Sequence, residues 1–173
     1  MMETRARKIR LLLLDVDGVM TDGRIVYDSN GVETKFFNVK DGLGIKLVQR
    51  AGIEVGIISG RGSRVVDDRA AELGIAILYQ RAADKLGPYQ EILRKLHISD
   101  EEVAYIGDDI IDIPIFRRAG LCAAPADAID DVFPYVHYVT SRRGGWGAVR
   151  EVCDLILKAQ GKWDAATEKY LDR

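Results

Sequence analysis

The chain has 173 residues, of which 47% are hydrophobic, and its formal net charge is −2. This length and composition allow one sizeable hydrophobic core, which predicts a single domain over residues 1–173. Acidic and basic residues are interspersed along the chain, which argues against a nucleic-acid-binding surface. The sequence has no secretory signal pattern and no apolar run near the ~20 residues that a membrane-spanning helix needs, so we expect a cytoplasmic protein with no membrane partner.

The first predicted element is a buried strand. The apolar run Ile9 to Leu14 ends in Asp15-Val16-Asp17-Gly18, and such a run predicts a parallel strand that opens into a loop, where ligands of α/β sheets bind. Two carboxylates there suit phosphoryl chemistry, because one can attack phosphorus while its neighbour moves the proton. The alternative is that Asp-Gly only makes a turn and both carboxylates are solvated.

Strands and helices alternate after this point. Residues 24–37 predict a β-hairpin inserted after the first loop, because two β-prone runs flank a turn that contains Asn30-Gly31. The elements expected after it are helix 42–51, strand 53–58, helix 63–73, strand 75–78, helix 85–96, strand 103–106, helix 110–119, strands 121–124 and 135–139, and helix 149–160. The alternation predicts an α/β fold with a parallel sheet covered by helices on both faces.

The remaining segments lie at the ends of the chain and beside two cysteines. Residues 1–8 and 161–173 are expected to be loose, although Trp163 in the second segment leaves open that this tail docks on its own or another subunit. Cys122 and Cys153 lie in or beside apolar segments without CxxC spacing, which predicts buried reduced thiols and no disulfide or metal site.

Polar residues follow three further predicted strands. Ser59-Gly60-Arg61 follows the strand 53–58, Lys85 comes after the strand 75–78, and Gly107-Asp108-Asp109 follows the strand 103–106. Because the carboxyl ends of parallel strands meet at one edge of a sheet, we expect these residues in one site. Phosphoryl transfer needs a nucleophile, a cation, hydrogen-bond donors and a metal, and this set supplies each of them.

Each of these residue types has an expected role. Asp15 and Asp108 suit Mg²⁺, which takes one or two carboxylates beside other oxygens, and Asp17 is expected to be the general acid and base. Ser59 and the amides after it can donate hydrogen bonds to phosphate at the start of a helix, and Lys85 supplies a positive charge. Taken alone, Ser59 favours a helix cap and Lys85 favours a solvated side chain, but their order and strand-end placement reverse this and favour the site.

As a set, these segments resemble the motifs of the haloacid dehalogenase superfamily, which are DxD, a Ser or Thr, a Lys and GDDxxD. More narrowly, the segments DVDGVMTDG, FFNVKDGLGIK, IISGR, LYQRAADK, YIGDDIIDIP and GGWGAVREVCDLIL are similar to those of the 3-deoxy-D-manno-octulosonate (KDO) 8-phosphate phosphatases. The resemblance implies a Rossmann-like three-layer α/β/α fold with a small β-hairpin in place of a large cap domain. It further implies a Mg²⁺ cofactor, a homotetramer and hydrolysis of KDO 8-phosphate through an aspartyl phosphate, in lipopolysaccharide biosynthesis.

The resemblance also implies roles for single residues. It makes Asp15 the nucleophile and a metal ligand, Asp17 the acid/base whose backbone carbonyl also binds the metal, and Asp108 the third protein ligand. Ser59 and Lys85 would hold the phosphate. Asp109 and Asp112 are expected to support the site from behind, by orienting metal-bound water or Lys85.

An acidic sugar phosphate requires cations for its carboxylate, and Arg61, Lys40 and Arg81 are candidates by position, although each could also be a surface charge. Relatives commonly carry a basic residue where this chain has Trp146 and a glycine where it has Arg81, which affects expected substrate contacts more than catalysis. Two other functions remain open, a phosphatase for another sugar-acid phosphate such as a nonulosonate 9-phosphate, and a non-catalytic oligomerisation module. The retained acidic, serine and lysine positions speak against the second.

Overall fold

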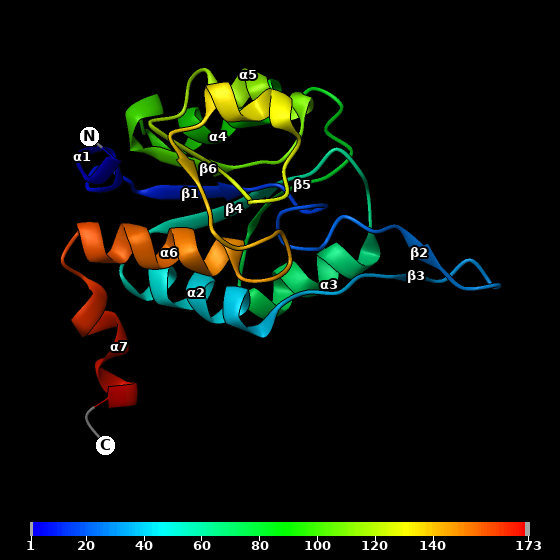
Figure 1. Ribbon diagram of the computed structural model, residues 1–173, viewed down its shortest axis with the longest axis horizontal. Helices are drawn as coiled ribbons and strands as arrows, with labels where there is room; N and C mark the ends of the chain where they lie inside the picture. Colours follow the sequence, from blue (N-terminus) through cyan, green and yellow to red (C-terminus); the bar gives the residue numbers. More distant parts are fainter. Residues whose placement is uncertain (1, 172–173) are drawn as a thin grey trace.

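The computed structural model describes residues 2–171 and is built around a six-stranded sheet with the order β5-β4-β1-β6-β7-β8 (Figure 1). The strands are β1 (Leu11–Leu14), β4 (Glu54–Ile58), β5 (Ile77–Tyr79), β6 (Val103–Ile106), β7 (Leu121–Ala124) and β8 (Tyr138–Val139), and all neighbouring pairs are parallel. β1 pairs with β4 on one side and β6 on the other. The predicted parallel sheet is confirmed, and Asp15 directly follows one of its inner strands.

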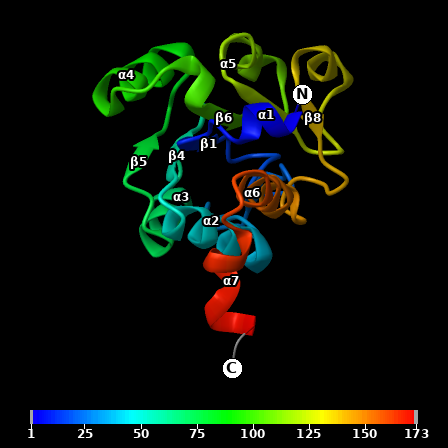
Figure 2. The same ribbon diagram turned by 90° about the vertical axis from the view of Figure 1, so that its left-hand side faces the viewer.

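Helices cover both faces of the sheet, because alternate residues of each strand point to opposite sides. Leu12 and Leu14 of β1 belong to a core shared with α2 (Val39–Arg50), α3 (Arg64–Leu73) and α6 (Ala148–Ala159). Leu11 and Leu13 belong to a second core. That core is shared with α4 (Leu86–Leu96) and α5 (Ile113–Phe116) and flanked by the 3-10 turns η1 (Asp100–Glu102), η2 (Ile110–Asp112) and η3 (Asp130–Tyr135). Figure 2 shows the two helical layers on either side of the sheet, which confirms the three-layer α/β/α architecture.

The predicted hairpin is present and projects away from the rest of the molecule (Figure 1). It consists of β2 (Val26–Tyr27) and β3 (Glu33–Thr34), which pair antiparallel. Apolar side chains of the hairpin remain exposed, namely Ile25, Tyr27, Val32 and Phe36. The regular pairing is shorter than the predicted runs, since β pairing is stable where side chains pack against a core and these face solvent.

The beginning of the chain is helical, so the predicted loose segment is wrong for its described part. Residues Met2–Ala6 form α1, and Ala6 is fully buried. The Gln160 amide donates hydrogen bonds to the carbonyl oxygens of Ala6 at 3.1 Å and Ile9 at 2.8 Å. These contacts with α6 stabilise a segment whose composition alone carries little structural signal. Met1 lies outside the described residues.

The tail also forms a helix, α7 (Trp163–Leu171). Trp163 packs against the core under α6, and the Lys158 ammonium lies 5.0 Å from the centroid of its ring. Thr167 is buried, whereas Tyr170 is half exposed. The docking alternative is therefore confirmed for Trp163 on its own subunit, and the loose tail is wrong for the helical residues. Residues 172 and 173 lie outside the described part of the chain.

Two predicted elements are shorter in the structure because prolines begin or interrupt local turns. The helix expected over 110–119 is the turn η2 followed by the short helix α5, in whose first turn Pro114 lies. The strand expected over 135–139 keeps only the two residues of β8, because η3 contains Pro134 and ends at Tyr135.

Cys122 and Cys153 are buried and free, as predicted, and burial raises the pKa of the Cys122 thiol to about 12. Within residues 2–171, every helix is too short or too polar to cross a lipid bilayer.

Asp41 is a buried carboxylate that joins two helices. It lies in the first turn of α2, and its Oδ1 accepts a hydrogen bond at 2.8 Å from the backbone amide of Arg150 in the first turn of α6. Burial raises the pKa of Asp41 from its ordinary value of 3.8 to about 6. The backbone amides of Arg150 and Gly147 and the charges of nearby arginines lower this pKa, but burial outweighs them. The fold therefore contains a carboxyl group that resists ionisation.

We predict that Asp41→Asn flattens part of the pH dependence of stability. Between the two pKa values the folded chain keeps a proton that the unfolded chain has lost, so ionisation of Asp41 lowers the free energy of unfolding as the pH rises through that window. The total is on the order of 3 kcal/mol at most. Asparagine keeps the acceptor for Arg150 and does not ionise. Urea unfolding at pH 4 and pH 7 checks this, and an equal change with pH in both proteins would contradict it.

Candidate active site

The carboxyl ends of three neighbouring strands form one pocket. Asp15 follows β1, Ser59 follows β4, and Asp108 comes shortly after β6. The pocket has a volume of about 230 Å³ and is lined by Asp15, Asp17, Gly23, Ser59, Gly60, Arg61, Asp108, Asp109 and Ile111. Most of the predicted site residues thus lie together, as expected for strand ends of a parallel sheet.

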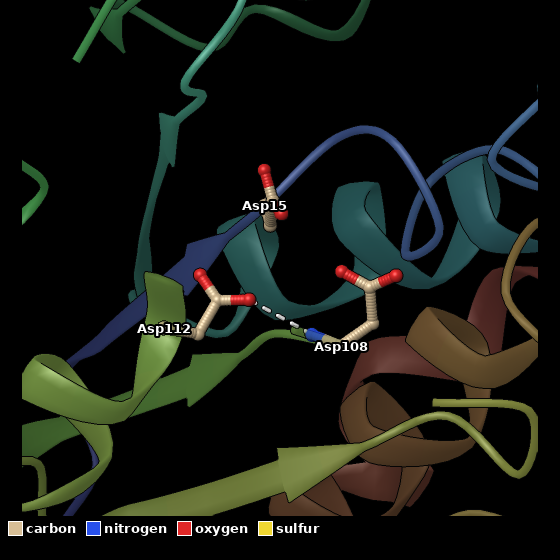
Figure 3. Close-up of side chains that lie close together, drawn as sticks. All are labelled: Asp15, Asp108 and Asp112. Atoms are coloured by element: carbon tan, nitrogen blue, oxygen red, sulfur yellow. Dashed lines mark hydrogen bonds between the residues drawn. The ribbon is translucent and has the colours of Figure 1, made fainter. Parts of the chain in front are cut away.

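A cluster of carboxylates lies at the base of the pocket. Oxygens of Asp15, Asp108 and Asp112 lie within 4.8 Å of one another (Figure 3). Burial raises the pKa of Asp15 to about 7 even though Lys85 opposes this, and burial together with the Asp15 carboxylate raises the pKa of Asp108 to about 8. Crowded carboxylates of this kind are the donors that Mg²⁺ prefers. The cluster therefore fits the predicted metal site.

Asp112 is already engaged by the protein. Its Oδ1 accepts hydrogen bonds at 2.6 Å from both the Lys85 ammonium and the Tyr105 hydroxyl. Its Oδ2 accepts from the backbone amides of Asp108 at 2.9 Å and Asp109 at 3.2 Å, the first of which is drawn in Figure 3. Asp112 thus fixes both the lysine and the loop that carries Asp108, which fits the supporting role expected of it. The Asp109 side chain instead caps the turn η2.

Lys85 is buried behind the pocket. Its Nζ lies 3.0 Å from Asp15 Oδ2 and 2.6 Å from Asp112 Oδ1, and its side chain is fully inaccessible. Burial by itself lowers the pKa of Lys85, but the two carboxylates outweigh this and hold its pKa above the ordinary value. The lysine is therefore charged, and the alternative of a solvated lysine is wrong.

Glycines allow two loops to approach the carboxylates closely. Gly18 has a φ of 85°, and a Cβ at this position would collide with Asp108 Oδ2. A Cβ at Gly144 would collide with the carbonyl oxygen of Gly18, and the Gly145 amide donates a hydrogen bond to Val19 O at 3.0 Å. The glycine-rich segment before α6 thus packs directly against the loop that follows Asp15.

Asp17 has a partner that the sequence did not indicate. Its Oδ1 lies 2.5 Å from the Nζ of Lys35, and its Oδ2 lies 3.6 Å from Arg61 Nη1. Lys35 directly follows β3, and its contact with Asp17 exists because the base of the hairpin lies beside the pocket. The expected state of a lysine in a hairpin strand is solvated, so no local pattern points to this residue.

Two predicted substrate contacts lie elsewhere. Lys40 is absent from the pocket lining and borders a second cavity of about 340 Å³ together with Arg142 and Trp146. Arg81 has a φ of 56°, and its side chain packs over Gly62. A contact of either residue with substrate stays a prediction.

Comparison with known proteins identifies relatives over nearly the whole chain. Residues 38–120 match the model of the haloacid dehalogenase-like hydrolases. The chain is 53% identical over 162 residues to 3-deoxy-D-manno-octulosonate 8-phosphate phosphatase KdsC of Escherichia coli K12, which covers 94% of this chain and 86% of that protein.

Solved structures agree with this. The phosphatase of the same description from Yersinia pestis has a TM-score of 0.92 at 53% identity, covering 93% of this chain and 87% of that one. The enzyme from Moraxella catarrhalis, in complex with magnesium, phosphate and KDO, has a TM-score of 0.95 at 43% identity, covering 98% and 97%. The expected magnesium cofactor is thus supported by a bound ion in a relative and by the carboxylate cluster of this chain. The chain belongs to the 3-deoxy-D-manno-octulosonate 8-phosphate phosphatases, a family of phosphoric monoester hydrolases within the haloacid dehalogenase superfamily.

Proposed function

We propose that this protein hydrolyses KDO 8-phosphate to KDO and inorganic phosphate through an aspartyl phosphate on Asp15. The observation that carries the proposal is the pocket in which Asp15, Asp17, Ser59 and Asp108 meet. The 53% identity to KDO 8-phosphate phosphatases supports the choice of substrate. The product places the reaction in lipopolysaccharide biosynthesis, which is consistent with a cytoplasmic enzyme.

In the first half of the proposed reaction, Asp15 attacks phosphorus and Asp17 protonates the leaving sugar oxygen. Ser59 and the Gly60 amide donate hydrogen bonds to the phosphoryl oxygens, while Lys85 lies 3.0 Å from Asp15 and offsets its charge. In the second half, Asp17 takes a proton from the water that hydrolyses the aspartyl phosphate. The same two carboxylates thereby serve both halves.

A divalent cation completes the proposed site. The Asp15 and Asp108 carboxylates and the backbone carbonyl of Asp17 would hold Mg²⁺, with Asp112 and Asp109 supporting them. When bound, the ion offsets the repulsion between Asp15 and the phosphate, which is worth roughly 4 kcal/mol per charge pair at ~4 Å and an effective dielectric constant of ~20.

Substrate selection is proposed to involve Arg61 and the hairpin. Arg61 lines the pocket with its side chain 38% exposed and donates a hydrogen bond to the Tyr27 hydroxyl of the hairpin at 3.0 Å. We propose that its guanidinium exchanges this contact for the carboxylate of an acidic sugar. Because the hairpin leaves Tyr27 and Phe36 exposed, we propose that it packs against other copies in a homotetramer that closes the pocket. Lys40 and Arg81 would contribute only within such an assembly.

The test is phosphate release from KDO 8-phosphate, a nonulosonate 9-phosphate and a hexose phosphate, each with Mg²⁺ and with excess chelator. The proposal predicts a strong preference for KDO 8-phosphate and loss of turnover with chelator, because the carboxylates then repel the phosphate. Preference for the nonulosonate 9-phosphate would contradict KDO 8-phosphate as the substrate and assign the nonulosonate 9-phosphate in its place. Absence of release from all three would favour an oligomerisation module.

A further inference from the structure

Lys35 is a buried cation on an otherwise exposed hairpin. Its side chain is 1% exposed, although the hairpin residues around it include exposed Val32 and Phe36. Lysine is almost never buried to this extent without a charged partner. Its Nζ has two, Asp17 Oδ1 at 2.5 Å and Glu33 Oε1 at 3.4 Å.

Glu33 connects the same lysine to the loop that carries the phosphate-binding residues. Its Oε2 accepts a hydrogen bond at 2.5 Å from the Ser63 hydroxyl, and its Oε1 lies 3.4 Å from Arg61 Nη2. The hydrogen bond from Ser63, together with Lys35 and Arg61, holds the pKa of Glu33 below its ordinary value. Glu33 is therefore an anion that fixes Lys35 from the hairpin side.

We infer that Lys35 is a positioning residue that holds the Asp17 carboxyl group beside the leaving oxygen. Asp17 gives this oxygen, in the first half of the reaction, the proton that it takes from water in the second half of the preceding turnover. This inference rests on the proposed function, which makes Asp17 the acid and base. Arg61 does not substitute for Lys35, because its Nη1 lies 3.6 Å from Asp17 and its Nη2 instead donates a hydrogen bond to the Tyr27 hydroxyl at 3.0 Å. Since Lys35 directly follows β3, the base of the hairpin supplies the ammonium group that holds Asp17 in place. The hairpin thus contributes a residue to the proposed proton transfer.

The way in which kcat/KM depends on the leaving group distinguishes a role of Lys35 in proton transfer from a role in structural support alone. A sugar alkoxide needs a proton as it leaves, whereas p-nitrophenolate does not, and kcat/KM covers only the steps through transfer of phosphorus to Asp15. We expect Lys35→Met to lower kcat/KM by about 10²-fold for KDO 8-phosphate and by less than about fivefold for p-nitrophenyl phosphate. Lys35→Arg, which keeps the charge, should restore much of the first value.

Lys46→Met is the matched control. The Lys46 ammonium donates a hydrogen bond at 2.7 Å to the carbonyl oxygen of Leu73, away from the pocket, and both kcat/KM values should stay unchanged. An equal loss on both substrates with Lys35→Met, and no recovery with Lys35→Arg, would mean that Lys35 only braces the hairpin and would overturn the inference.

Two further variants keep the outcome decisive. If Lys35→Met does not fold by circular dichroism, Glu33→Gln replaces it, with a smaller loss of the same selectivity expected and a non-selective loss contradicting the inference. Asp17→Asn should show the selective loss in full. If Asp17→Asn lowers kcat/KM selectively for KDO 8-phosphate but Lys35→Met does not, only the role of Lys35 is overturned. If Asp17→Asn lowers kcat/KM equally for both substrates, the proposed role of Asp17 as the general acid is overturned.

Discussion

Replacement of Asp15 by asparagine is expected to lower phosphate release by at least about 10⁴-fold without loss of the fold. The amide has nearly the shape of the carboxylate but is not a nucleophile. The change also removes a charge that burial disfavours, since burial raises the pKa of Asp15 to about 7. The variant should therefore unfold at the same or a higher temperature and sediment like the wild type.

The control for this variant is Asp68→Asn, an exposed aspartate on α3. It makes the same chemical change outside the pocket and should leave turnover unaltered. Turnover of Asp15→Asn within about tenfold of the wild type, which is only ~1.4 kcal/mol of barrier, would rule out Asp15 as the nucleophile.

Lys85→Met is expected to reduce both stability and turnover. The lysine lies between Asp15 and Asp112 with no access to solvent, so its removal leaves two buried carboxylates without their cation. Loss of one partner of a buried ion pair costs about 3–5 kcal/mol. Urea unfolding in the presence of a chelator, so that no metal replaces the charge, measures the effect together with kcat.

The double variant Lys85→Met with Asp112→Asn separates the two effects. It removes the charge at Asp112 that the lysine had offset, so we expect most of the free energy of unfolding to return while turnover stays low. A single variant that unfolds within about 1 kcal/mol of the wild type would contradict the account of Lys85 as a buried counter-ion.

Much of the site could be predicted because it depends on strand ends. The run Leu11–Leu14 is buried on both faces, and a parallel strand of this kind has a recognisable apolar sequence. Asp15 and Ser59 each follow directly the apolar strand that places them, and Asp108 follows its strand after one glycine. The sheet topology then brings these positions together without further information.

The missed features depend on contacts between distant segments. Lys35 contacts Asp17 because the base of the hairpin lies beside the pocket, and α1 is stabilised by Gln160 near the other end of the chain. The sequence left open whether Trp163 docks, because its contacts with Lys158 and the core beneath α6 come from distant packing. Tertiary packing supplies most of the stability of short helices such as α1, so local propensity says little about them. The position of Lys40 also depends on tertiary packing. Its place at the start of a helix does not predict which cavity its side chain borders, and it borders the second cavity.

The measurement that tests the central claim most directly is chemical trapping of the covalent intermediate. The enzyme is mixed with KDO 8-phosphate and Mg²⁺, quenched in acid during turnover and reduced with hydride, which converts an aspartyl phosphate to homoserine. Peptide mass spectrometry should find homoserine at position 15 in the wild type and none in a sample without substrate. Turnover that leaves Asp15 unmodified under these conditions, or homoserine at another aspartate, would contradict the account.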